Sequence, residues 1–189
     1  MSAQDSKLFV ISGPSGAGKG TLVPRVRERR SNLGLTVSAT TRAPRKGEVD
    51  GVNYFFLTRE EFDRRVANGE FVEWAEVHGN CYGTLVSEVT SKLASGASLI
   101  LEIDVQGALQ VKERFPEVVL IFIKPPSLEV LRERLVGRGT ETPETIELRM
   151  ANAADELALA DRYDDVVVND DLDRATDELV RVLDMHERI

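Results

Sequence analysis

The amino-acid sequence predicts an α/β protein whose mainly parallel, five-stranded sheet carries helices on both faces. The first observation is that apolar, strand-like runs alternate with segments of helical periodicity on either side of residues 37–90. The second is the run at 98–104, which is apolar without alternation until it ends in acids, as in a parallel strand buried on both faces. Residues 37–90 interrupt the alternation, and we expect them to form an inserted lobe of mixed α/β structure.

The amino-terminal part begins with a buried strand. Residues 7–12 form an apolar run, and 18–31 are predicted to form a helix in which Pro24 lies near the start, where a missing N–H is tolerated. Residues 35–38 predict a second, short strand. The following polar segment, 40–48, is rich in turn-forming residues and cannot contribute to a core.

The inserted lobe is predicted to contain two further strands and two helices. Thr58 and Glu61 have the spacing of a capping box, which opens a helix that runs to about Ala67. The strands are 53–57 and 71–77, and the second helix is 85–94.

Strands and helices alternate again after the lobe. Ser127 can cap a helix, and Thr142 followed by Pro143 is an N-cap with proline at the first helical position. The remaining strands are 98–104, 118–124 and 165–169. The last helix is expected after Asp170 or Asp171, with an apolar stripe of Leu172, Ala175, Leu179 and Leu183.

A glycine-rich stretch, 13–21, lies between the first strand and the first helix and reads Gly-Pro-Ser-Gly-Ala-Gly-Lys-Gly-Thr. Its glycines allow a tight turn that gathers several N–H groups, and the helix adds the positive end of its dipole. Such a loop binds phosphate, and Lys19 can reach the outer phosphates of a nucleoside triphosphate. The alternative is an ordinary glycine-rich turn. Gly20 stands where this motif usually has Ser or Thr, so the nearest hydroxyl is that of Thr21.

Composition excludes several classes of protein. The net charge of −8 argues against nonspecific binding to nucleic acid or membranes. No run approaches the ~20 apolar residues of a transmembrane helix, and polar residues 1–7 leave no room for a signal peptide. Cys81 is the single cysteine and cannot form an internal disulfide, and with 2 His residues a zinc site is not expected. We therefore expect a cytoplasmic protein.

Two acids follow the apolar run at 98–101. Glu102 and Asp104 are two residues apart, so in a strand both would point to the same side near its carboxyl end. Ligands of open α/β sheets bind beyond those ends. The alternative is a carboxylate that merely caps the helix that begins at Val105.

Arginines and hydroxyls of the lobe predict a second phosphate site. Arg42 and Arg45 lie in one loop, and Tyr54, Tyr82 and Thr84 supply hydroxyls nearby in the sequence. Planar guanidinium groups and phenol donors suit a phosphate that is separate from the first.

In these and other stretches the chain resembles the guanylate kinase family. The matching stretches are 13–21, 37–45, 47–51, 71–74, 79–83, 103–107, 134–140 and 168–172, and they span nearly the whole chain. The resemblance implies one domain, 1–189, with a P-loop NTPase-type core. Its implied parts are the core (1–36, 91–125 and 160–189), a GMP-binding lobe (37–90), and a helical lid with flanking helices (126–159).

The resemblance also implies transfer of the γ-phosphoryl group of ATP to GMP or dGMP in purine nucleotide metabolism, with Mg²⁺ bound together with ATP. The catalytic residues would be Lys19, Arg42, Arg138 and Arg149. The ATP-binding residues would be Gly13, Pro14, Ser15, Gly16, Ala17, Gly18, Lys19, Gly20, Thr21 and Asn169. The GMP-binding residues would be Ser38, Arg42, Arg45, Tyr54, Glu73, Tyr82, Thr84 and Asp104. The chain departs from the family at Cys81, often Tyr, and at Glu102, in some members Asp.

The hydrogen-bonding groups of guanine explain why a carboxylate at Glu73 would suit its recognition. Guanine presents N1–H and the N2 amino group side by side, so an ionised carboxylate accepts from both, whereas adenine presents an acceptor at N1. A buried polar site that is left unpaired or repelled rejects the wrong substrate by ~10⁴-fold or more. The alternative for Glu73 is a solvated charge on a strand.

The acceptor in this reaction needs no general base, because the second pKa of a phosphate monoester is about 6. His78 and His186 are accordingly expected at the surface. Since Gly20 has no hydroxyl, no direct protein ligand to Mg²⁺ is expected, and Glu102 or Asp104 would contact its waters.

Lid closure would bring Arg138 and Arg149 onto the transferring group, so that transfer to GMP outcompetes transfer to water. The alternative for both is a solvated helix face.

Two other functions remain open. A guanylate-kinase-like protein-interaction module would depend on losing the phosphate loop or its lysine, and Lys19 is present. A small kinase for a phosphosugar would keep Lys19 and the arginines without needing Glu73. The expected partners are small molecules, with a monomer or a small homo-oligomer as the assembly.

Overall fold

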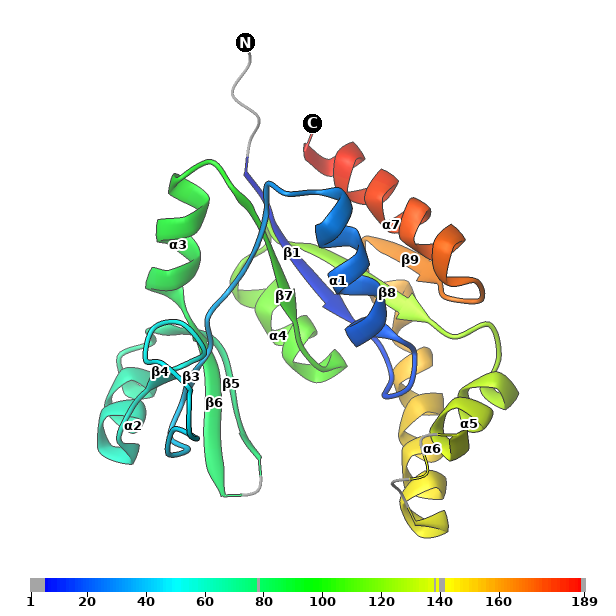
Figure 1. Ribbon diagram of the computed structural model, residues 1–189, viewed down its shortest axis with the longest axis horizontal. Helices are drawn as coiled ribbons and strands as arrows, with labels where there is room; N and C mark the ends of the chain where they lie inside the picture. The colour runs from blue at the N-terminus through cyan, green and yellow to red at the C-terminus, as the bar shows by residue number, and fades with distance from the viewer. Residues whose placement is uncertain (1–5, 78, 138, 140–141, 188–189) are drawn as a thin grey trace.

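A computed structural model describes residues 6–77, 79–137, 139 and 142–187. A five-stranded sheet forms its centre, and every neighbouring pair of strands in that sheet is parallel. The strands are β1 (Leu8–Ser12), β2 (Leu33–Leu35), β7 (Ser98–Glu102), β8 (Val119–Lys124) and β9 (Asp165–Val168), in the order β2-β7-β1-β8-β9 (Figure 1). The predicted fold class is therefore confirmed.

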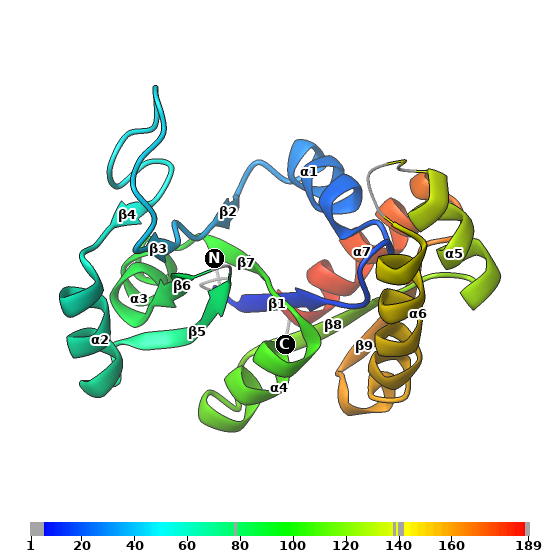
Figure 2. The same cartoon turned by 90° about the horizontal axis from the view of Figure 1, so that it is seen from below.

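Helices cover both faces of this sheet because its strands are apolar on both sides. Leu8, Val10 and Leu101 pack on one face with α4 (Val105–Arg114) and α3 (Val86–Ala94). Phe9, Ile11 and Ile100 alternate with them and pack on the other face. That second face is covered by α1 (Lys19–Arg29) and α7 (Leu172–Glu187), which lie side by side in Figures 1 and 2.

A second sheet of mixed direction, with one helix, forms what we call the lobe. Its strands are β4 (Phe55–Phe56), β3 (Ala39–Thr40), β6 (Asn80–Leu85) and β5 (Phe71–Val77), in that order, and its helix is α2 (Arg59–Ala67). The Thr58 hydroxyl accepts from the Glu61 N–H, as the capping box predicts. Phe62 of α2 is fully buried and stacks on Phe71, with ring centroids 4.4 Å apart.

Two helices follow the core strand β8 and form a hairpin with its own small core. They are α5 (Leu128–Gly137) and α6 (Pro143–Leu157). The predicted caps are present: the Ser127 hydroxyl accepts from the Val130 N–H and the Thr142 hydroxyl from the Thr145 N–H. A short 3-10 helix, η1 (Ala160–Arg162), leads into β9. The lobe and the α5–α6 hairpin lie on opposite sides of the central sheet (Figures 1 and 2).

The strand predicted at 35–38 is wrong, because the chain changes sheets there. β2 ends at Leu35 in the central sheet, and β3 begins at Ala39 in the lobe. Side chains of α3 hold the crossing between them: Lys92 donates to the Leu35 carbonyl at 2.7 Å, and Glu88 accepts from the Val37 N–H at 2.9 Å. The sequence pattern of a short strand cannot reveal to which sheet it belongs.

Strand β6 has no counterpart among the predicted elements. Its residues, Asn80–Leu85, include turn-forming types, yet they pair with β5 and β3 in antiparallel fashion. A Cβ atom at Gly83 would lie 2.7 Å from the Glu73 carbonyl oxygen, so the position requires glycine for close packing. The same glycine that weakens the strand pattern therefore allows the strand to pack.

No helix within the described residues is both long and apolar enough to span a membrane.

Candidate active site

The phosphate loop follows β1 and ends in α1, as predicted. Gly13 and Gly18 have φ of 142° and 94°, which residues with a side chain rarely adopt. Neighbours also leave them no space: a Cβ at Gly13 would lie 2.2 Å from the Ile123 carbonyl oxygen, and one at Gly18 2.3 Å from the Asn169 amide nitrogen. The loop therefore lies tightly against β8 and the end of β9.

Lys19 is folded back over the loop. Its ammonium group donates to the carbonyl oxygens of Gly13 (2.5 Å) and Pro14 (3.1 Å). Gly18 precedes α1 without a side-chain cap, so the positive end of this helix faces the loop with no side-chain acceptor on it. At Gly20 a Cβ atom would meet nothing within 4 Å, so a larger residue would fit there.

A cavity of about 430 Å³ adjoins the loop between α5 and the start of α7. Asn169, predicted at the ATP site, lines it and donates to the Ala17 carbonyl at 2.8 Å. Arg134 of α5 also lines it and donates to the Asn169 carbonyl at 2.8 Å. Sequence reasoning gave Arg134 no role, although it opens the matching stretch 134–140.

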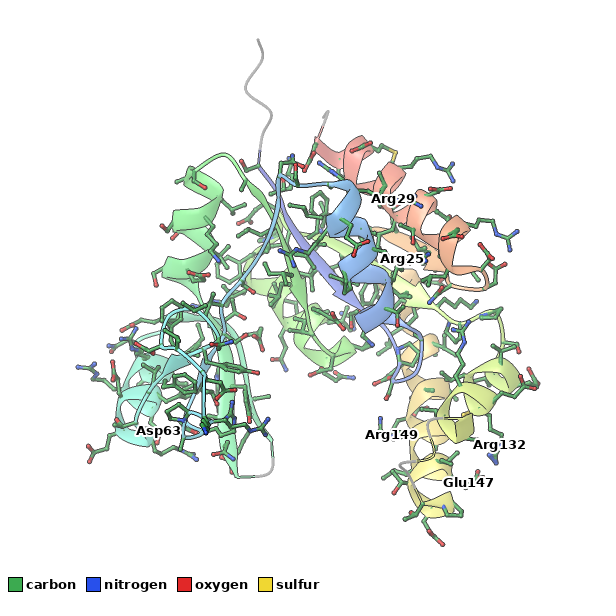
Figure 3. All side chains as sticks on the ribbon, in the orientation of Figure 1. Arg25, Arg29, Asp63, Arg132, Glu147 and Arg149 are labelled. Carbon is green, nitrogen blue, oxygen red and sulfur yellow. The ribbon has the colours of Figure 1, made fainter. Side chains whose placement is uncertain are left out.

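Arg149 of α6 contacts the loop by donating to the Ser15 hydroxyl. In Figure 3 it lies on the side of α6 away from Arg132 and Glu147, which pair with each other across the hairpin. Its contact therefore joins the α5–α6 hairpin to the phosphate loop. Arg138, the other predicted lid arginine, lies outside the described residues.

The acids after β7 lie differently from the expectation. The strand ends at Glu102, so Glu102 and Asp104 do not share a strand face, and this part of the prediction is wrong. Asp104 instead caps α4, accepting from the Gly107 N–H at 2.8 Å. Partial burial raises the pKa of Glu102, although it keeps exposed surface, and the positive charge of Lys19 lowers it. Burial also raises the pKa of Glu156, and the charge of Lys19 lowers it. The sequence analysis assigned no role to Glu156.

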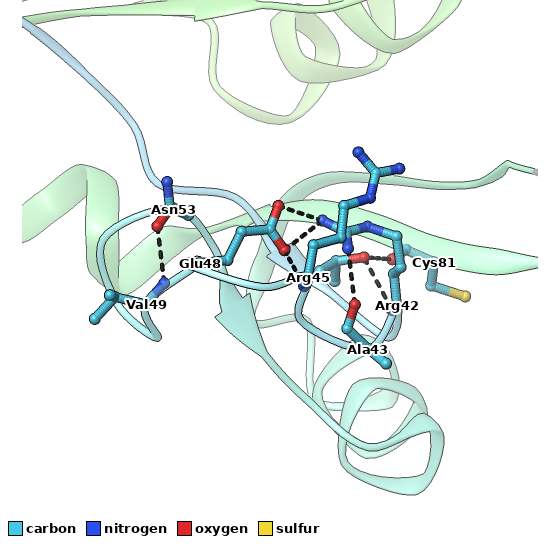
Figure 4. Close-up of polar contacts among 8 residues, drawn as sticks. Arg42, Ala43, Arg45, Glu48, Val49, Asn53 and Cys81 are labelled. Atoms are coloured by element: carbon cyan, nitrogen blue, oxygen red, sulfur yellow. Dashed lines mark hydrogen bonds and ion pairs between the residues drawn. The ribbon is translucent and has the colours of Figure 1, made fainter.

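The lobe carries the second group of predicted residues on one loop and one sheet face. Arg42 forms an ion pair with both carboxylate oxygens of Glu48, at 2.9 and 3.0 Å (Figure 4). Its guanidinium also lies over the Tyr54 ring, 5.4 Å from the centroid. By donating these hydrogen bonds, Arg42 lowers the pKa of the Glu48 carboxyl group. The position of Arg42 thus depends on Glu48, to which the sequence analysis assigned no role.

Arg45 uses only its backbone in this pair. Its N–H donates to Glu48 at 2.6 Å, while its exposed guanidinium extends away from the carboxylate (Figure 4). Tyr82 lies edge-on to Tyr54, with centroids 6.2 Å apart. Arg42, Tyr54 and Tyr82 are therefore brought together. Ser38 is held beside this cluster, because its carbonyl accepts from the N–H of Phe55, the residue after Tyr54, at 2.9 Å.

Glu73 lies directly across from Thr84 in the β5–β6 pair, and the Thr84 hydroxyl donates to its carboxylate at 2.8 Å. Burial raises the pKa of Glu73, the Thr84 hydrogen bond lowers it, and the charge of Asp104 raises it. The carboxylate therefore lies on the Thr84 face of the lobe sheet, where the charge of Asp104 in the core also acts on it.

Two separate constellations are thus present. One is a glycine-rich loop with a lysine, between a central parallel strand and a helix; the other is an arginine and tyrosine cluster with a half-buried carboxylate on the lobe. The fold and the loop define a P-loop nucleotide-binding protein, and the second cluster is suited to a second, phosphorylated ligand.

Comparison with known proteins agrees with this class and narrows it. The chain belongs to the guanylate kinase family, whose model matches residues 5–186. It is 56% identical to the guanylate kinase of Gloeobacter violaceus over 178 residues, covering 94% of this chain and 87% of that protein. It is 52% identical to the guanylate kinase of Halalkalibacterium halodurans, covering 97% of this chain and 90% of that one. The crystal structure of guanylate kinase from Anaplasma phagocytophilum superposes with a TM-score of 0.71 at 37% identity, covering 97% of this chain and 87% of that chain.

Proposed function

We propose that this protein is an ATP:GMP phosphotransferase, which moves the γ-phosphoryl group of ATP to GMP and releases ADP and GDP. The observation that carries the proposal is the pairing of two sites in one fold: a lysine-bearing phosphate loop on the core, and the Arg42, Tyr54 and Tyr82 cluster beside Glu73 on the lobe. Each site alone would account for one phosphorylated ligand, and the two sites together fit a reaction between two such ligands.

The core would bind ATP. The phosphate loop, 13–21, offers backbone N–H groups and the start of α1 to the phosphates, and Lys19 would exchange its contacts with Gly13 and Pro14 for phosphate oxygens. The adenine would occupy the cavity lined by Arg134 and Asn169, whose planar guanidinium and amide suit a flat base.

The lobe would bind GMP, or dGMP. Arg42 and Arg45, with the hydroxyls of Tyr54 and Tyr82, would hold its phosphate, and Glu73 would accept from N1–H and N2 of the guanine with Thr84, Ser38 and Asp104 around it. The existing pair with Glu48 orders Arg42 before GMP arrives, which reduces the entropy lost on binding. GMP phosphate would have to share this guanidinium with Glu48 or displace the carboxylate from it.

Phosphoryl transfer would then depend on position and charge rather than on a general base. Arg149 already contacts Ser15 of the loop and would reach the transferring group from α6, together with Arg138. Closure of the α5–α6 hairpin and of the lobe would exclude water from the two phosphates.

Magnesium is expected to enter with ATP. The acidic groups whose pKa Lys19 influences, Glu102 and Glu156, fit a role in holding water molecules of the hydrated ion, and the carboxylate of Glu102 lies at the ligand-binding end of β7. When bound, Mg²⁺ would neutralise part of the charge on the ATP phosphates. We further propose that the protein works in the cytoplasm, where both nucleotides are available.

The proposal is tested by ADP release from ATP and Mg²⁺ in the presence of GMP, dGMP, AMP, CMP, UMP or a phosphosugar. We expect GMP to be preferred over AMP, CMP and UMP by orders of magnitude. Equal use of AMP and GMP would refute the guanine assignment. Preference for a phosphosugar would favour the alternative hypothesis of a phosphosugar kinase.

A further inference from the structure

The alternation of side chains between the two faces of strand β5 is interrupted near its start. Phe71 stacks on Phe62 of α2, and Trp74 also contacts Phe62, edge-on at 6.2 Å. In an uninterrupted strand, residues 71 and 74 would point to opposite faces. Both lie instead on the face of β5 that α2 covers, where Phe71 is buried and Trp74 is half-exposed.

A β-bulge at Val72 accounts for this reversal. Phe71 pairs with Leu85, but the next pair is Glu73 with Thr84, so β5 has one residue more than β6 at this point. Val72 is buried and packs in the main core cluster with Val89 of α3. Without the extra residue, Glu73 would share a face with Phe71 and point into the lobe interior; with it, Glu73 faces Thr84 and the core.

One side chain of the core holds the beginning of this strand. Arg114, the last residue of α4, donates to the carbonyls of Phe71 and Gly69, at 2.5 Å each. One donor therefore holds the turn that leads into β5, and the other holds the residue immediately before the bulge. Gly69 has φ of 70°, and a Cβ there would lie 3.3 Å from the Arg114 guanidinium, so the turn and the arginine are closely fitted.

We propose that the bulge at Val72 and the Arg114 guanidinium form a positioning device for the Glu73 carboxylate, and that Arg114 is a specificity-determining residue for the guanine base although it does not touch it. The bulge turns the carboxylate toward the substrate, and Arg114 fixes the bulge relative to the core. This inference rests on the proposed use of GMP.

Inosine monophosphate is the sensitive probe, because its base keeps the N1–H of guanine and lacks the N2 amino group. The GMP-over-IMP ratio of kcat/KM therefore reports how well Glu73 is aimed at N2. Arg114→Met keeps an apolar chain of similar reach and removes both donors. We expect it to reduce this ratio by about threefold to tenfold, the range that the net contribution of one ordinary hydrogen bond covers, while KM for ATP stays unchanged.

Two further variants separate positioning from general stability. Arg114→Lys retains a single point-like donor and should restore part of the ratio. Arg29→Met is the matched control, because Arg29 is an exposed arginine of α1 that pairs with Asp177 of α7 and touches neither the loop nor the lobe. It should leave the ratio unchanged.

Hydrogen exchange of the peptide segment 69–77 gives a readout that needs no substrate. We expect faster exchange in Arg114→Met than in Arg29→Met, with the central strands β1 and β8 unchanged in both. Faster exchange with an unchanged GMP-over-IMP ratio would reduce Arg114 to a structural role and overturn the inference, as would no difference between the two variants. A wild-type protein that does not prefer GMP over AMP would contradict the proposed function itself.

Discussion

The phosphate loop and the lobe face are built in opposite ways. The loop is one continuous stretch, 13–21, whose shape comes from backbone conformation and from Gly13, Gly16 and Gly18, which neighbours leave no space to replace. The lobe face draws Arg42, Tyr54, Glu73 and Tyr82 from separate strands and loops and holds them by side-chain contacts. A backbone site is therefore defined by local sequence, whereas a side-chain site depends on how distant segments meet.

Replacement of Lys19 tests the first half most severely. Since the loop is otherwise backbone, Lys19→Met should remove its one mobile charge and reduce kcat by about 10³-fold, in the range for a lost transition-state contact. Circular dichroism and the melting temperature should stay near wild type, because the loop glycines remain. Full activity in this variant would refute the role of the loop.

Replacement of Glu73 tests the second half. Glu73→Gln turns part of the acceptor into a donor that faces N1–H, so we expect the GMP-over-AMP ratio of kcat/KM to fall by about 10²-fold. Glu76→Gln is the matched control, since Glu76 lies on the same strand, is exposed and pairs with Arg59. An equal effect of both changes would argue against recognition of the base by Glu73.

Loss of the contact between Arg149 of α6 and Ser15 of the phosphate loop should have a smaller effect. Arg149→Ala should reduce kcat by about tenfold or more with little change in stability, whereas Arg132→Ala on the same hairpin removes only the exposed pair with Glu147 and should stay within about twofold. Unchanged steady-state kinetics in Arg149→Ala would leave this arginine as part of a solvated helix face.

The raised pKa of Glu73 gives the lobe a pH dependence that the loop lacks. A protonated carboxyl presents a donor instead of an acceptor, so the GMP-over-AMP ratio should fall several-fold as pH decreases through the raised pKa toward the ordinary carboxyl value of about 4.3. Glu73→Gln should abolish this dependence. A ratio that is independent of pH in the wild type would contradict the ionised form as the recognising species.

The raised pKa of Glu73 also makes the stability of the protein depend on pH. Because the pKa of Glu73 in the folded state lies above its unfolded value, the folded protein binds more protons between the two, and its free energy of unfolding decreases as pH rises through that interval. Thermal melts of the wild type and Glu73→Gln across this range would measure the difference.

The smallest expected effect concerns Gly20. A Cβ there meets nothing within 4 Å, so Gly20→Ser should fold normally and restore a hydroxyl at the position where the loop motif usually has one. We expect calorimetric affinity for ATP in the presence of Mg²⁺ to rise about twofold to threefold, with no change when Mg²⁺ is left out. A gain that does not depend on Mg²⁺ would assign the effect to the helix rather than to the ion.

This difference between the loop and the lobe also explains how much of the fold and of the site could be predicted from the sequence. The parallel sheet and the glycine loop were predictable because apolar runs, glycines and helix caps act within a few residues of each other. Strand β6 was not, since Gly83 weakens its strand pattern and only the neighbouring strand β5 gives that glycine its purpose. Glu48, Arg134 and Arg114 were missed for a related reason: each acts on a group that the fold, rather than the sequence, brings near.

The lobe interior also holds the one thiol of the chain. Cys81 lies fully buried beside Phe62 and Phe71, and burial raises its pKa, so in the closed lobe it is shielded from reagents and poor as a nucleophile. A thiol reagent can modify it only when the lobe opens. The rate of that modification therefore measures the transient opening of the lobe alone, separately from the unfolding of the central sheet.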